Sequence, residues 1–124
     1  MDITPAIPEG RQVIDAYGDG GFRISRRRVE GSVIIFPGQT MPWPVTAMQD
    51  LTAAAFEPVL QRAGEVEVLL LGCGPSIAFL KADIRAALRD RGIVTDVMDT
   101  GAASRTYNVL LAEDRRVAAA LIAV

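Results

Sequence analysis

The chain has 124 residues and a formal net charge of −2, and half of its residues are hydrophobic although only 6% are aromatic. This length suits a single domain. The near balance of charge provides none of the positive field on which non-specific nucleic-acid binding depends, so nucleic acid is not an expected partner. A core poor in aromatic residues must be built from Val, Leu, Ile and Ala, a composition that favours β-strands covered by alanine-rich helices.

Histidine is absent from the chain, and cysteine occurs once, as Cys73. The absence of histidine removes the most common general base near neutral pH and the most common metal ligand, so neither a metal site nor a cofactor is expected. A single thiol is typical of a reducing compartment. No apolar run approaches the ~20 residues that a membrane-spanning helix needs. We therefore expect a cytoplasmic protein that does not span a membrane.

The beginning of the chain differs in character from the rest. Residues 1–12 contain Pro5 and Pro8 and show little periodicity, which predicts an extended N-terminal arm. The remaining residues, 13–124, contain no repeat, low-complexity tract or linker. They are therefore expected to form one domain.

A β-hairpin is expected directly after the arm. Apolar residues within 13–17 and 22–25 flank the turn Gly18-Asp19-Gly20-Gly21, a pattern typical of two antiparallel strands. Three arginines at 26–28 mark the next reversal, and 29–36 reads as a β-rich strand. The N-terminal third is thus predicted to be an antiparallel β unit.

Three prolines limit the secondary structure that the segment 42–62 can form. Pro42 and Pro44 confine any strand near them to the edge of a sheet, because proline cannot donate a hydrogen bond to a ladder. A helix is expected over 53–62, with Thr52 as its N-cap. Pro58 lies inside that range and predicts a kink.

The clearest strand of the chain is the near-continuous apolar run over 65–71, which indicates burial on both faces. Residues 72–76 break this strand, and apolar residues at helical spacing from Phe79 predict a helix that ends before Gly92. A second strand is expected over 93–98. Together these segments predict a βαβ unit with parallel strands.

The last third of the chain contains one more helix and one more strand. The helix is expected to begin at 99–101, and its buried face is marked by residues spaced three and four apart, namely Ala103, Tyr107, Leu110 and Leu111. The strand is expected over 115–124. The predicted fold is therefore an α/β domain with an N-terminal antiparallel β unit and a central βαβ unit.

Several short motifs occur in a fixed order between about Ile14 and Ile122. They are Tyr17-Gly18 with Phe22, Gly31-Ser32-Val33 before Pro37, Trp43, Leu69-Leu70-Leu71-Gly72-Cys73-Gly74, Val97-Met98-Asp99-Thr100, Ala103, Arg105-Thr106-Tyr107-Asn108-Val109-Leu110, Glu113 and Arg115-Arg116-Val117-Ala118-Ala119-Ala120-Leu121. In these motifs the chain resembles the Mth-type (Mth938-like) domain family of unknown function, whose members include a mitochondrial assembly factor for respiratory complex I and an adipogenesis-associated protein. The resemblance implies a three-layer α/β domain around a mixed β-sheet. It also implies a role in complex I assembly.

The clearest candidate site lies where the two parallel strands of the βαβ unit are expected to end. Their C-terminal ends bring the loops at 72–76 and 99–105 to one rim of the sheet, the usual ligand position in an open α/β sheet. Each loop leads into a helix N-terminus, where unpaired N–H groups and the helix dipole favour a small anion. The predicted lining of this crevice consists of Gly72, Cys73, Gly74, Ser76, Asp99, Thr100, Ser104, Arg105 and Asn108.

The same residues also have a structural interpretation, which is the favoured one. Glycine after a strand and Thr100 before a helix are what tight turns and caps require. Asp99 is a lone carboxylate suited to capping, and Asn108 in mid-helix indicates burial with hydrogen bonds or contact with a ligand. A helix N-terminus lowers the pKa of a thiol, but without histidine as a base Cys73 is better explained as a small buried hydrophobe.

Two features outside the crevice suggest contacts with other proteins. Arg26, Arg27 and Arg28 form either a solvated turn or a docking patch for an acidic partner. Trp43 is either an exposed interface anchor or, as favoured, a cover for the edge of the sheet.

The sequence contains no recognisable catalytic set, and its oligomeric state is left open. The favoured function is therefore a non-enzymatic accessory or assembly factor that acts through contacts with other proteins. The alternative is a protein that binds a small molecule or anion in the crevice, with or without enzymatic activity.

Overall fold

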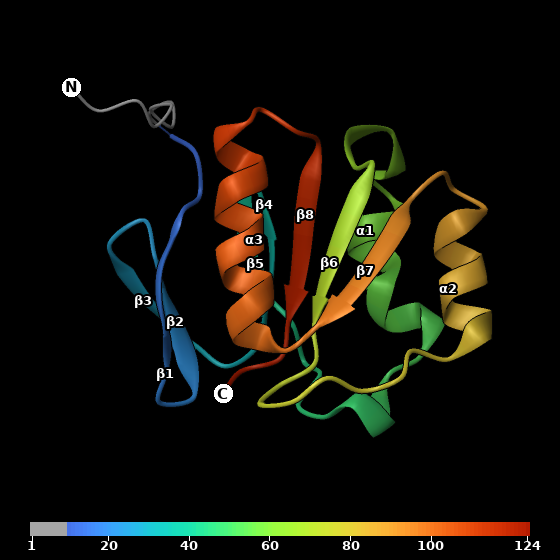
Figure 1. The fold of residues 1–124 in the computed structure, drawn as a ribbon, viewed down its shortest axis with the longest axis horizontal. Helices are drawn as coiled ribbons and strands as arrows, with labels where there is room; N and C mark the ends of the chain where they lie inside the picture. The colour runs from blue at the N-terminus through green and yellow to red at the C-terminus, as the bar shows by residue number, and fades with distance from the viewer. Residues whose placement is uncertain (1–9) are drawn as a thin grey trace.

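The centre of the molecule is a five-stranded mixed sheet in the order β5-β4-β8-β6-β7 (Figure 1). The computed structural model describes residues 10–124. The strands of this sheet are β4 (Val33–Phe36), β5 (Gln39–Pro42), β6 (Val68–Gly72), β7 (Val94–Met98) and β8 (Val117–Leu121). Strand β4 is antiparallel to both of its neighbours, whereas β6 is parallel to both β7 and β8. The predicted mixed sheet and its parallel βαβ unit are confirmed.

A second, three-stranded antiparallel sheet stands beside the first (Figure 1). It consists of β1 (Ile14–Gly18), β2 (Gly21–Ile24) and β3 (Arg27–Glu30). The predicted hairpin and antiparallel β unit are thus confirmed, but the prediction of one strand over 29–36 is wrong. Gly31 adopts a left-handed φ of +80° at that point, which turns the chain from β3 into β4 of the other sheet.

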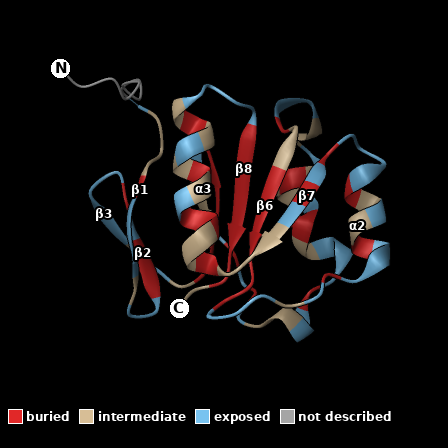
Figure 2. Cartoon of the chain, viewed as in Figure 1, coloured by how far each residue is buried: buried red, intermediate tan, exposed pale blue. Residues whose placement is uncertain are grey.

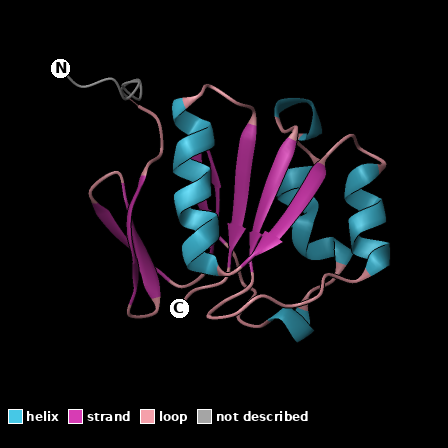
Figure 3. Ribbon diagram, viewed as in Figure 1, coloured by secondary structure: helices cyan, strands magenta, loops and turns pink. Residues whose placement is uncertain are grey.

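Helices cover the two faces of the five-stranded sheet and give three layers (Figure 3). Helix α3 (Thr100–Ala112) lies on one face, together with the three-stranded unit. The other face is covered by α1 (Glu57–Leu60), α2 (Ala82–Arg89) and residues of the short 3-10 turns η1 (Met48–Asp50), η2 (Ala53–Phe56) and η3 (Ala63–Glu65). Side chains alternate along β8: Val117, Ala119 and Leu121 face α3, while Ala118 and Ala120 face the opposite layer. The three-layer α/β fold implied by the resemblance is confirmed.

Two predicted helices begin later or are shorter than expected. The segment 53–62 forms a 3-10 turn followed by a single α-helical turn, and Pro58 lies at the start of that turn, where proline is tolerated, instead of kinking a longer helix. Thr52 makes no side-chain capping bond. Helix α2 begins at Ala82, so Phe79 lies in the preceding loop and is fully exposed.

The two edges of the central sheet differ. Strand β5 is an edge strand, as Pro42 and Pro44 predict, and β7 forms the other edge. Figure 2 shows that β6 and β8 are mostly buried while β7 is largely not. Most of the predicted N-terminal arm, 1–9, lies outside the described residues. Among the helices formed by residues 10–124, none has the length and apolar character of a membrane span.

Candidate functional site

The two loops of the predicted crevice do meet at one rim of the sheet. The Thr100 N–H donates to the Gly74 carbonyl at 2.9 Å, and the Gly74 N–H donates to Thr100 Oγ1 at the same distance. The parallel pairing of β6 with β7 places them there, because both loops leave the same ends of neighbouring strands. The juxtaposition expected from the sequence is therefore correct.

The polar groups at this rim are already paired with one another. The Thr100 hydroxyl donates to the Ile122 carbonyl at 2.7 Å, and Ser104 Oγ donates to the Thr100 carbonyl at 2.8 Å. Asp99 accepts from the Ala102 N–H through its side chain at 2.8 Å, and its carbonyl accepts from the Ala103 N–H at 2.9 Å. The Ala103 bond is the first regular bond of the helix, and of the N–H groups that a helix start leaves over, those of Thr100 and Ala102 have acceptors within the protein. This supports the structural interpretation of Asp99 and Thr100.

Close packing explains the glycines of the first loop. A Cβ atom on Gly72 would lie 2.9 Å from Leu121 Cδ2 and 3.0 Å from the Cα of Thr100, so any side chain there would have to displace Leu121 or the start of α3. Gly74 has a φ of +102°, a conformation that residues with a side chain rarely adopt. Both glycines are thus required by the fold, whether or not a ligand binds nearby.

Cys73 is a buried thiol whose Sγ donates to the Ala78 carbonyl at 3.7 Å. Burial raises the pKa of this thiol, and the nearby Asp99 carboxylate raises it further. A raised pKa keeps the sulfur protonated and unreactive, which agrees with the interpretation as a small hydrophobe. In the part of the chain that the structure describes, no three His, Cys, Asp or Glu side chains gather closely enough to hold a metal ion.

The remaining predicted crevice residues, Asn108, Arg105 and Ser76, take no part in the hydrogen bonds that join the two loops. Asn108 accepts from the Ile14 N–H at 3.0 Å and donates to the Ile14 carbonyl at 2.7 Å, so it binds the first strand to α3. Arg105 Nη1 donates to the Tyr17 hydroxyl at 2.7 Å, beside a small cavity of about 200 Å³. Ser76 is exposed. Anion binding at the rim stays a prediction.

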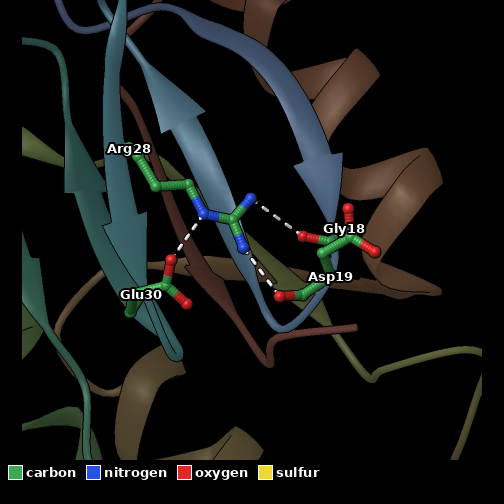
Figure 4. Close-up of polar contacts among 4 residues, drawn as sticks. All are labelled: Gly18, Asp19, Arg28 and Glu30. Carbon is green, nitrogen blue, oxygen red and sulfur yellow. Dashed lines mark hydrogen bonds and ion pairs between the residues drawn. The ribbon is translucent and has the colours of Figure 1, made fainter.

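The arginine cluster at 26–28 is divided between structural and exposed roles. Arg28 donates to the Gly18 and Asp19 carbonyls at 3.0 and 2.7 Å and to the Glu30 carboxylate at 2.7 Å (Figure 4). The hydrogen bond from Arg28 lowers the pKa of Glu30 below its ordinary value. Arg28 thus holds the turn between β1 and β2, while Arg26 and Arg27 are exposed and remain candidates for contact with a partner.

Trp43 is buried, with only 4% of its surface exposed. Its Nε1 donates to the Ala55 carbonyl at 2.8 Å, and its ring packs against Phe56 at a centroid distance of 5.6 Å. The interface-anchor alternative is therefore wrong, because β5 leads this side chain into the core between the sheet and the η2 turn. The favoured prediction, burial at the edge of the sheet, is confirmed.

A hollow that the sequence did not reveal runs along the free edge of β7. One cavity of about 460 Å³ is lined by residues 77–80, by Arg85 of α2 and by Thr95, Asp96 and Val97. A second cavity of about 240 Å³ is lined by Arg85, Arg89, Ile93, Val94 and Thr95. The two cavities share Arg85 and Thr95, and we call them together the β7 groove.

The β7 groove combines an unsatisfied polar group with exposed apolar side chains. Thr95 is 6% exposed, and its Oγ1 has no hydrogen-bond partner among residues 10–124. Phe79 is 100% exposed, and Ile77 and Val94 are 67% and 65% exposed. The signal that could have identified this region is the two-residue spacing of Ile77 and Phe79, which is typical of extended chain and not of a helix.

A comparison with protein families gives one match over almost the whole chain. The model of a family described as "Protein of unknown function (DUF498/DUF598)" matches residues 14–122. The chain belongs to this family. The match includes both sheets and all the helices described above, so the DUF498/DUF598 fold is the complete three-layer domain.

Relatives of this DUF498/DUF598 chain fall into two groups. An uncharacterized protein of Rhodobacter capsulatus is 41% identical over 113 residues, which are 91% of this chain and 86% of the relative. The NADH dehydrogenase [ubiquinone] 1 alpha subcomplex assembly factor 3 of Homo sapiens is 35% identical over 109 residues, which are 88% of this chain. The matched region is 59% of the human protein, so the chain spans about three-fifths of its length.

Solved structures share the fold of this DUF498/DUF598 chain. A crystal structure described as an outer membrane protein from Bartonella henselae has a TM-score of 0.87 and 44% identity, and covers 93% of this chain and 97% of its own. A Bordetella pertussis protein described as a Mth938-like domain has a TM-score of 0.81 and 30% identity, and covers 99% of this chain and 92% of its own. The resemblance to Mth-type domains is therefore confirmed.

Proposed function

We propose that this DUF498/DUF598 protein is a non-enzymatic accessory factor that acts through contacts with other proteins. The observation that carries the proposal is the exposure of Ile77, Phe79 and Val94 along one edge of the domain. Moving an apolar side chain of this size out of water is favourable by about 1.5–3 kcal/mol, so exposed side chains of this kind are typical of contact surfaces. The internal pairing of the polar groups at the rim near Thr100 adds support, because it leaves few groups for chemistry there.

The similarity to assembly factors supports the same function. Proteins named as NADH dehydrogenase [ubiquinone] 1 alpha subcomplex assembly factor 3 in Homo sapiens, Mus musculus and Danio rerio are 34–35% identical to this chain. We extend the proposal to assembly of a respiratory NADH dehydrogenase by a cytoplasmic protein. Deletion of the gene should then reduce the amount of assembled NADH dehydrogenase in native gels. Unchanged assembly would rule out this specific role but not the general one.

Affinity purification at native expression level tests the general function. The wild-type protein should recover a reproducible set of proteins, and the double variant Ile77→Ser with Phe79→Ser should lose them. Val109→Ser is the matched control, because Val109 is also an exposed apolar residue, at 56% exposure, but belongs to α3, the helix that covers the other face of the sheet. Recovery of nothing above the level of an untagged strain would contradict the proposal.

A further inference from the structure

We propose that the β7 groove receives an extended segment of a partner protein, which adds a strand to the free edge of β7. The segment would place an apolar side chain against Ile77 and Phe79 and a carboxylate near Arg85 and Arg89. This inference rests on the proposed function and specifies the binding mode and the chemistry of the partner. Its evidence comes from the backbone of β7, the shape of the groove, one buried hydroxyl and the charges around it.

The backbone of β7 offers hydrogen-bonding groups on its free side. Val94 donates its N–H to Glu67, and Met98 accepts from the Cys73 N–H, so these two residues point toward β6. The alternation of a parallel ladder then turns the N–H and C=O groups of Thr95 and Val97 away from β6. Arg85 Nη1 donates to the Thr95 carbonyl at 2.8 Å. Among residues 10–124 the Thr95 N–H and both groups of Val97 have no backbone partner, so they remain for an added strand.

The two edges of the sheet are protected differently. Strand β5 ends in Pro42, which cannot donate to an added strand and so blunts that edge. Strand β7 has no proline between Val94 and Met98, and α2 leaves a groove beside it instead of covering it. An exposed edge of this kind is the receptor in strand-addition complexes, where main-chain hydrogen bonds provide affinity and pockets select side chains.

The groove selects an apolar side chain. Its larger cavity of about 460 Å³ lies between β7 and the loop that carries Ile77 and Phe79. Both side chains are mostly exposed, so a segment lying on β7 would bury them at the same time as it pairs with the strand. Alternate residues of an extended segment point to the same side, which allows one apolar residue to enter the cavity while its neighbours face away.

Thr95 supplies the independent observation that a polar ligand group belongs in the groove. It is 6% exposed and borders both cavities, yet its Oγ1 has no partner among residues 10–124. A buried hydroxyl without a hydrogen bond is costly, so buried polar groups in native proteins nearly always have a partner. A polar group on the docked segment would satisfy it.

The charges around the groove favour an acidic segment. Arg85 and Arg89 both line it, and in the described part of the chain neither guanidinium has a carboxylate within ion-pair distance. Asp96 is the one acidic residue among the lining residues of the two cavities. A carboxylate at the Arg89 end of the segment would therefore find complementary charge.

Nuclear magnetic resonance of the full chain with synthetic peptides tests the proposal. The probes are short peptides that alternate valine with serine, with glutamate at each serine position in turn, and lysine counterparts as matched controls. At least one glutamate peptide should bind and slow hydrogen exchange of the Thr95 and Val97 amides by about tenfold or more. Its lysine counterpart and an N-methylated version, which lacks the paired N–H groups, should bind about tenfold more weakly.

Surface variants complete the test without disturbing the core. Arg89→Glu and Phe79→Ser should each weaken binding of the glutamate peptide. Arg23→Glu changes an exposed residue of β2, outside the groove, and should leave the binding unchanged. Absence of binding across the panel, or binding without protection of the Thr95 and Val97 amides, would overturn strand addition. Self-association that disappears in Phe79→Ser would overturn it in favour of a second copy. If cellular partners are recovered while the peptides fail, the accessory function stands and only the binding mode is wrong.

Discussion

The loops at the rim near Thr100 and the β7 groove contrast in how their polar groups are used. The rim contains the residues that the sequence marks as functional. The side chains of Thr100, Ser104 and Asp99 nevertheless form hydrogen bonds with backbone groups of the protein itself. The groove contains no recognisable motif, yet the buried hydroxyl of Thr95 has no hydrogen-bond partner in the described part of the chain. Residue type and spacing therefore identify where the backbone must turn, whereas unpaired groups identify where a partner is missing.

Two threonines make this contrast measurable. Thr100 and Thr95 are both buried, at 0% and 6% exposure, and valine has nearly the shape of threonine without the hydroxyl. Replacement of each by valine exchanges the hydroxyl for a methyl group of similar size, so the change in unfolding free energy reports whether that hydroxyl was paired.

The largest effect is expected at Thr100. Its Oγ1 accepts from the Gly74 N–H and donates to the Ile122 carbonyl, so Thr100→Val leaves two backbone groups without partners. We expect a loss of about 2–4 kcal/mol in the free energy of unfolding, measured by urea denaturation. Thr100→Ser, which keeps the hydroxyl, is the control and should lose clearly less. A loss in Thr100→Ser with little change in Thr100→Val would show that the methyl group and not the hydroxyl matters.

A smaller loss is expected from a methyl group on Gly72. The added Cβ would lie about 3 Å from Thr100 and Leu121, so Gly72→Ala should cost about 1–3 kcal/mol by overpacking. The control is Gly38→Ala, since a Cβ on Gly38 meets nothing within 4 Å. A neutral Gly72→Ala would indicate that the two loops can separate, and would reopen the rim as a binding crevice.

Much of the fold could be predicted from the sequence because its signals are local. The apolar run over 65–71 and the helical spacing of Ala103, Tyr107 and Leu111 correctly indicate β6 and the buried face of α3. The break at Gly31 was missed, because a single left-handed glycine inside a β-rich run resembles any other glycine. Phe79 was placed in a helix because it directly precedes Leu80, Ile84 and Leu88, whose four-residue spacing is that of a helical face.

The candidate site was harder to predict because hydrogen-bond pairing is not local. The partner of the Thr100 hydroxyl is Ile122, at the far end of the chain, and Asn108 bonds to Ile14, 94 positions away. Nothing in the sequence indicates that Thr95 lacks such a partner. Both facts appear only once the strands are arranged in space.

Inorganic phosphate tests anion binding at the rim, and the expected shift in melting temperature is near zero. Because the Thr100 and Ala102 N–H groups at the start of α3 already have acceptors within the protein, phosphate should leave the melting temperature unchanged in both the wild type and Arg105→Ala. Differential scanning fluorimetry over a range of concentrations measures this. A saturable rise in melting temperature that Arg105→Ala abolishes would establish the anion site.

Thr95→Val is the most direct test of the central claim that the unpaired polar group lies in the β7 groove. The Thr95 hydroxyl has no partner to lose among residues 10–124, so the free energy of unfolding from urea denaturation should stay unchanged or rise by up to about 1 kcal/mol. The fold should remain intact, and binding of the glutamate peptide should weaken. A loss of stability as large as that of Thr100→Val would show that the Thr95 hydroxyl is already satisfied, and would contradict the account.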